Sequence, residues 1–127
     1  MKTLRIITAL FFIGVFVPVA QAQDAVKMAG SVYQNLMDND RVRLLKVDLQ
    51  PEERTVTHFQ PDHLLYVLEG GKLAIQDTTG NAGVVDLAAG DYHWFKAGKH
   101  SIVNIGTTTI VAIVVELKEE SALKPEE

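Results

Sequence analysis

Cysteine is absent from this chain of 127 residues. No disulfide can therefore cross-link the domain, and any metal site has to be built from nitrogen and oxygen ligands. A bacterial lipoprotein is also excluded, because its lipid anchor needs a cysteine at the cleavage site. The fold must rest on its hydrophobic core alone, and the length is sufficient for one such domain.

A long run of apolar residues is also missing, although a short one lies near the start. Two basic residues precede the apolar run 6–17, and Ala20 and Ala22 form an A-x-A cleavage pattern. This arrangement predicts a secretory signal peptide over residues 1–22 and a periplasmic or secreted protein without a stable membrane anchor after cleavage. The alternative, an uncleaved anchor, is disfavoured because the run is shorter than the roughly 20 residues that span a bilayer.

Basic clusters are lacking as well. Removal of residues 1–22 takes away Lys2 and Arg5 and no acidic residue, so the formal charge changes from −4 to −6. A net acidic chain without a basic patch is a poor match for nucleic acid or for an anionic membrane surface.

A convincing helical period is not found either. Residues 23–40 form a mixed N-terminal segment, in which 31–37 suits a helical turn or an edge strand. Beyond it, short β-rich runs alternate with turn signals, and strands are predicted at 41–49, 54–59, 63–68, 72–76, 82–87, 92–95, 100–105 and 107–117. This spacing predicts an all-β sandwich or barrel over 41–118, followed by a flexible charged tail at 119–127. The run 107–117 is apolar on both faces, which predicts a central strand.

Three of the four histidines occupy strand positions that suggest a shared site. His58 and Gln60 are two residues apart, so a strand presents them on one face, and His63 follows the turn at Pro61 and Asp62. His100 begins a strand far along the chain. Neutral imidazole is a common metal ligand, and we predict one metal site from His58, Gln60, His63 and His100. A single histidine on an apolar strand is more often structural, and Asp62 is either a turn residue or an acceptor that orients His63.

Two stretches of the chain resemble the two motifs of the cupin superfamily. They are H-F-Q-P-D-H-L-L-Y-V-L-E-G at 58–70 and G-D-Y-H-W-F-K-A-G-K-H-S-I-V-N at 90–104, and the likeness covers roughly 45–117. Residues that match the motifs are His58, Gly70, Gly90, Gly98, His100 and Asn104. The chain departs from the motifs in four ways: Gln60 replaces a histidine, His63 stands where a glutamate is expected, Lys96 replaces a proline, and one residue is missing between Gly98 and His100. The resemblance implies a double-stranded β-helix, a jelly-roll barrel with a metal in its mouth, and a homodimer.

The departures change the charge of the implied site. With every proposed ligand neutral, a divalent ion keeps its double positive charge and attracts an anionic ligand. Open coordination positions suit Fe, Mn, Ni or Zn, and hence a dioxygenase, isomerase or lyase that acts on a small anionic molecule. The other hypothesis is a non-catalytic small-molecule or metal-binding cupin module. No catalytic residue is identified, because no nucleophile–base pair, phosphate loop or H-E-x-x-H helix is present.

Overall fold

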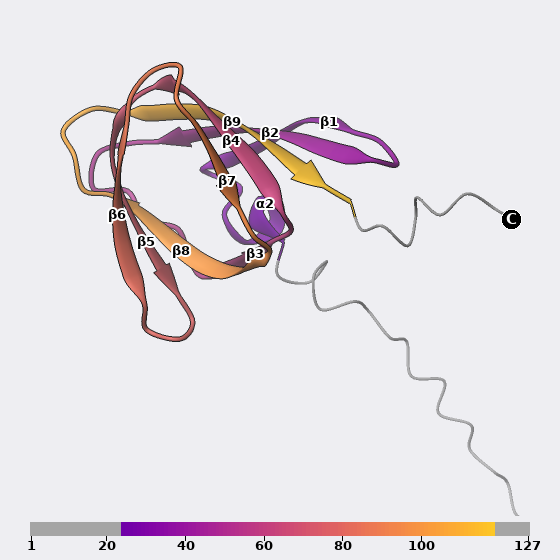
Figure 1. The fold of residues 1–127 in the computed structure, drawn as a ribbon, viewed down its shortest axis with the longest axis horizontal. Coiled ribbons are helices and arrows are strands. Elements are labelled where there is room, and N and C mark those ends of the chain that lie inside the picture. Colours follow the sequence, from indigo (N-terminus) through magenta and orange to yellow (C-terminus); the bar gives the residue numbers. More distant parts are fainter. Residues whose placement is uncertain (1–23, 119–127) are drawn as a thin grey trace, which may run out of the picture.

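Two antiparallel sheets form the body of the molecule. The computed structural model describes residues 24–118, and Figure 1 shows the two sheets facing each other. In this part of the chain the strands are β1 (Tyr33–Asp38), β2 (Val42–Leu49), β3 (His58–Gln60), β4 (His63–Glu69), β5 (Gly71–Asp77), β6 (Ala82–Leu87), β7 (Tyr92–Phe95), β8 (Gly98–Asn104) and β9 (Ile110–Leu117), and a short helix, α2 (Ala25–Met28), precedes them. Most of the predicted strands are found with small shifts at their ends, but the strand predicted at 54–59 shares only residues 58 and 59 with β3.

The strand order explains why the last strand is apolar on both faces. One sheet has the order β1-β2-β9-β4-β7 and the other β3-β8-β5-β6. β9 therefore lies in the middle of the larger sheet, as predicted. Its residues Ile110, Ala112 and Val114 are buried in the core, whereas Val111 and Ile113 are partly exposed on the outer face. Alternate residues of β2 and β4 complete the core from the same sheet.

The segment before residue 41 is an integral part of the barrel. β1 pairs with β2 at the edge of the larger sheet, so of the two alternatives for 31–37 the edge strand is correct. α2 contacts β1 and β3 and closes the end of the barrel where β3 lies. The boundary that we expected at residue 41 thus falls between two paired strands. The predicted signal peptide and charged tail lie outside the described residues.

Two glycines are required by their positions. A Cβ atom on Gly70 would lie 2.2 Å from the carbonyl oxygen of Leu87, so no side chain fits between these two turns. Gly90 has a φ of +88°, a conformation that side chains other than glycine rarely adopt. Both positions belong to the glycine framework of the cupin motifs.

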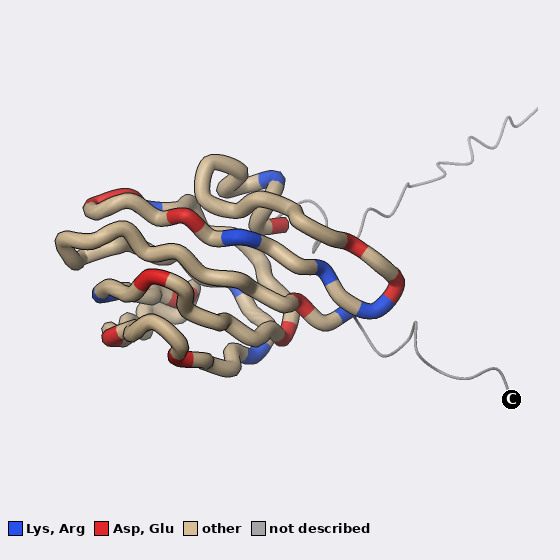
Figure 2. The backbone as a smooth tube through the Cα atoms, turned by 90° about the horizontal axis from the view of Figure 1, so that it is seen from above, with Lys and Arg blue, Asp and Glu red and all other residues tan. Residues whose placement is uncertain are grey.

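Charged residues are scattered over the molecule. Figure 2 shows that the lysines and arginines of residues 24–118 do not gather into one patch. None of the helices in this part of the chain has the length and apolar character needed to cross a membrane.

Candidate functional site

Strand pairing brings the four predicted site residues together. In the pairing of β3 with β8, His58 lies directly opposite His100, and their ring centroids are 4.8 Å apart. His63 begins β4, and its ring centroid lies 6.1 Å from that of His100. Gln60 follows His58 on the same inward face, as predicted, and both side chains are fully buried. Residues 42 positions apart in sequence thus share one site because their strands are neighbours.

Backbone carbonyl groups orient two of the histidines. The Nδ1 atom of His58 lies 2.9 Å from the carbonyl oxygen of Val56, and that of His63 lies 2.7 Å from the carbonyl oxygen of Pro61. Because a carbonyl can only accept, each Nδ1 carries the proton and each Nε2 keeps its lone pair. The Nε2 atom of His58 is buried and has no hydrogen-bond partner among residues 24–118.

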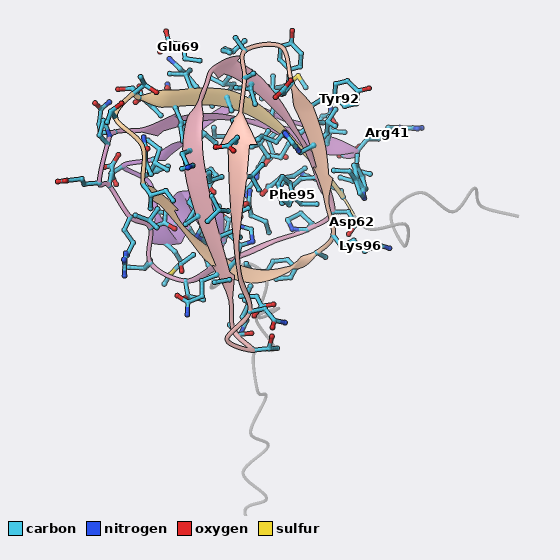
Figure 3. The ribbon with its side chains drawn as sticks, turned by 60° about the vertical axis from the view of Figure 1, so that its left-hand side comes forward. Arg41, Asp62, Glu69, Tyr92, Phe95 and Lys96 are labelled. Atoms are coloured by element: carbon cyan, nitrogen blue, oxygen red, sulfur yellow. The ribbon has the colours of Figure 1, made fainter. Side chains whose placement is uncertain are left out.

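Asp62 does not orient His63. Its carboxylate instead accepts a hydrogen bond of 2.6 Å from the backbone N–H of Ala97, which holds the turn between β3 and β4 against the turn before β8. Figure 3 shows Asp62 beside Lys96 at this end of the barrel. Of the two roles considered for Asp62, the turn residue is therefore the correct one.

Gln60 is the centre of a hydrogen-bond network. Its Nε2 donates to Oε2 of Glu116 at 3.1 Å, and its Oε1 lies 2.9 Å from Nε2 of His100. The hydroxyl of Tyr33 donates to the same Oε1 at 3.4 Å. The amide of Gln60 on β3 thus connects three residues of other strands: Tyr33 of β1, His100 of β8 and Glu116 of β9.

Glu116 is a site residue that the sequence analysis missed. It lies on β9 opposite His63 and is 2% exposed. Arg43 of β2 donates to its Oε1 from Nε at 2.7 Å and pairs with it through Nη2 at 2.6 Å, and Asp24 binds the other side of the guanidinium at 2.5 Å. A signal was present, because the inward alternation Ile110, Ala112, Val114 continues to Glu116.

Burial keeps the three imidazoles neutral. Loss of solvent lowers the pKa of His58 and of His63 below the ordinary histidine value. The pKa of His100 falls to about 4, first because of burial and then because of repulsion by His58 and His63. Burial and the negative charge of Glu116 raise the pKa of Tyr33, so its hydroxyl stays a donor.

A small cavity adjoins these groups inside the barrel. Its volume is about 40 Å³, enough for roughly three or four water molecules at ~10–15 Å³ each. Tyr33, Gln60, His63 and His100 supply its polar wall, and the rest of the wall is apolar. Phe95 points inward (Figure 3) and stacks on His63 with ring centroids 5.2 Å apart.

The donor set fits a transition metal in part. His58 and His63 present unprotonated Nε2 atoms whose Nδ1–H groups are anchored, the arrangement usual for histidine ligands. His100 and Gln60 are instead bonded to each other, and Nε2 of His100 can become a ligand only by giving up that bond. In keeping with this, within residues 24–118 no three His, Asp or Glu side chains are grouped so as to hold a metal ion as they stand.

Asn104, which matches a cupin motif, and His93, the fourth histidine, have other environments. Asn104 is fully buried and donates from Nδ2 to the carbonyl oxygens of Leu49 and Thr108, so it fixes a turn and is not part of the site. His93 lies opposite Leu65 on β7, and its Nε2 is buried without a partner.

Several solved structures with the same architecture are described as cupins. A cupin domain from Bordetella pertussis superposes with a TM-score of 0.63 at 22% identity, over 69% of this chain and 93% of that chain. An RmlC-like cupin family protein with a double-stranded β-helix fold from Methanocaldococcus jannaschii gives a TM-score of 0.58 at 16% identity, over 72% and 84%. The polyketide cyclase RemF from Streptomyces resistomycificus gives 0.52 at 26% identity, over 68% and 64%.

Sequence comparison adds nothing to these likenesses, since no family model and no curated protein sequence matches the chain. The structural likeness shows the fold: the chain is a cupin-type double-stranded β-helix, as the motif resemblance predicted.

Proposed function

We propose that this protein binds a divalent transition metal, Fe, Mn, Ni or Zn, through His58, His63 and His100, with Gln60 as an oxygen donor. The observation that carries the proposal is the buried Nε2 of His58, which has a lone pair and no partner. An unpaired buried acceptor costs about 1–3 kcal/mol, and a metal ion is one group that would satisfy it. Burial supports the same reading, because it holds all three imidazoles in the neutral form that metals bind.

The bound metal would act as a Lewis acid or activate dioxygen, and the molecule acted on is a small anion. The proposed ligands are neutral, so the metal would retain a double positive charge. The buried ion-pair network of Asp24, Arg43 and Glu116 carries a net charge of −1, which leaves an excess of one positive charge near the site. A small carboxylate or enolate would neutralise that excess. Dioxygenase, isomerase and lyase chemistry are all compatible with such a site.

A non-catalytic binding module is the second candidate. It is favoured by the hydrogen bond between His100 and Gln60, which satisfies both groups without a metal. The small volume of the cavity favours it too, because about 40 Å³ leaves little room for a substrate beside a metal.

Elemental analysis after loading with each metal separates the two candidates. The purified protein is compared with the triple variant His58→Ala, His63→Ala, His100→Ala and with a matched control, His93→Ala, which removes a histidine outside the site. We expect one metal per chain in the protein and in the control, and none in the triple variant. A protein that takes up no metal refutes the proposal and favours the binding module.

We further propose a homodimer that forms through the outer face of the larger sheet. Tyr66, Tyr92 and Trp94 are 44%, 73% and 51% exposed on this face, and Figure 3 shows Tyr92 pointing away from the barrel. Adjacent exposed aromatic residues typically mark an interface. Light scattering should give twice the chain mass for the protein and a single mass for Trp94→Lys, whereas a monomeric protein contradicts the proposal.

Export to the periplasm or the medium is proposed from the signal-like residues 1–22. The mass of the protein recovered from those fractions should correspond to a chain that begins at Gln23. A chain recovered from the cytoplasm with Met1 still attached would contradict export.

A further inference from the structure

The orientation of the Gln60 amide is determined by a carboxylate on another strand. Arg43 holds Glu116 as a carboxylate through contacts of 2.6 and 2.7 Å, and a carboxylate has no proton to donate. The group that faces Oε2 of Glu116 at 3.1 Å must therefore be a donor. Of the two ends of the Gln60 amide, only the nitrogen can serve, so the oxygen must point to the opposite side.

The opposite side of the amide faces His100. With Oε1 of Gln60 at 2.9 Å from Nε2 of His100, two lone pairs would meet unless the nitrogen carries a proton. His100 therefore has its proton on Nε2 and its lone pair on Nδ1. The Tyr33 hydroxyl also donates to Oε1, which is consistent with the same orientation of the amide.

The other two histidines have the opposite tautomer for a different reason. Backbone carbonyls two residues earlier in the chain hold the proton of His58 and of His63 on Nδ1. Their tautomers are thus set locally, whereas that of His100 depends on a residue of β9 that does not touch it.

We propose that Glu116 is the positioning residue of this site and that, through Gln60, it selects the Nε2–H tautomer of His100. Glu116 thereby decides whether the Nε2 atom of His100 donates a hydrogen bond or offers a lone pair. The proposal concerns the metal-free protein and goes beyond the ligand assignment above. A protein that never binds metal can still satisfy it.

The substitution Glu116→Gln makes the proposal testable. Arg43 donates with two groups to Oε1, so the single oxygen of the introduced amide is expected to stay with Arg43. The introduced NH₂ group would then face Gln60, whose amide must turn to present its oxygen. Turning directs the Gln60 nitrogen at His100, which has to become an acceptor at Nε2 and carry its proton on Nδ1.

The readout is the tautomer of each histidine, observed by long-range ¹H–¹⁵N NMR on metal-free, ¹⁵N-labelled protein at neutral pH. The unaltered protein should show Nε2–H for His100 and Nδ1–H for His58 and His63. In Glu116→Gln the His100 Nε2 signal should move downfield to the position of an unprotonated nitrogen, while His58 and His63 stay as they are. Glu69→Gln is the matched control, because Glu69 is exposed at the other end of the barrel (Figure 3) and should change none of the three.

The double variant Gln60→Glu, Glu116→Gln should restore the original tautomer. The introduced carboxylate accepts from the amide at position 116 and from Nε2–H of His100, so His100 again carries its proton on Nε2. An Nδ1–H tautomer of His100 in the unaltered protein overturns the proposal, and so does an unchanged His100 in a folded Glu116→Gln variant. If Glu116→Gln does not fold, the double variant is the decisive test, because an Nδ1–H tautomer of His100 in the double variant also overturns the proposal.

Discussion

Replacement of Arg43 by methionine tests how far the buried ion pair supports the fold. Arg43→Met keeps most of the side-chain volume and removes the partner of Glu116, whose side chain is 3% exposed. Breaking a buried ion pair from one side costs about 3–5 kcal/mol, because the remaining charge is left without compensation. Asp24 also loses its partner, but it is 16% exposed and can be hydrated. We therefore expect a loss of about 4 kcal/mol in the free energy of unfolding.

Urea denaturation at neutral pH measures this loss. With an m-value of about 2 kcal/mol per M, the midpoint should fall by roughly 2 M. Arg41→Met is the matched control, since Arg41 is exposed and points into solvent (Figure 3), and its cost should stay within about 0.5 kcal/mol.

A second substitution shows how much of the loss comes from the uncompensated charge of Glu116 and how much comes from lost packing. Addition of Glu116→Gln to Arg43→Met removes the uncompensated charge and leaves an amide that can accept from Gln60. The double variant should therefore recover at least about 2 kcal/mol relative to the single variant. A loss below about 1 kcal/mol for Arg43→Met, or a double variant no more stable than the single one, would refute the reasoning.

Three further predictions concern stability. The pKa of His100 is about 4 in the folded metal-free protein and near 6.5 in the unfolded chain, so the unfolded chain binds its proton first as the pH falls. The free energy of unfolding should therefore drop by up to about 3 kcal/mol between pH 7 and 4, at ~1.4 kcal/mol per pKa unit. The drop should be smaller in His100→Gln, and equal pH profiles of the variant and the unaltered protein would contradict the lowered pKa. Gly70→Ala should cost about 3 kcal/mol in urea denaturation, because its Cβ would collide with the Leu87 carbonyl, whereas Gly83→Ala meets no atom within 4 Å and should be neutral; equal effects would contradict the clash. Asn104→Ala should lower the thermal midpoint and cost about 2 kcal/mol, because the buried carbonyl of Leu49 and the half-buried carbonyl of Thr108 lose their donor, and an unchanged midpoint would contradict that role.

Local sequence patterns predicted most of the fold. Alternation and turn residues located the strands to within a few residues, since the period of two depends only on the chain itself. The predicted boundary at residue 41 left β1 outside the barrel, because a polar edge strand of this kind has no continuous apolar face that marks it in the sequence.

The candidate site was predicted only in its composition. Histidine is rare in this chain, and its spacing around Pro61 and Asp62 identified three of the residues that strand pairing gathers. Glu116, Arg43 and Tyr33 were not identified. The alternation of the last strand could have placed Glu116 inside the barrel, but it does not indicate which polar groups of other strands lie beside it.

The all-β architecture, the glycine turns of the cupin motifs and the inward face that carries His58 and Gln60 can all be read from the amino-acid sequence. These features depend on each residue and its immediate neighbours. The tertiary structure decided the hydrogen-bond pattern of the site: it placed the carboxylate of Glu116 behind Gln60 and turned the nitrogen of His100 toward that amide. The physical reason is that a buried polar group takes its role from the donors and acceptors that packing places around it, and those come from distant strands.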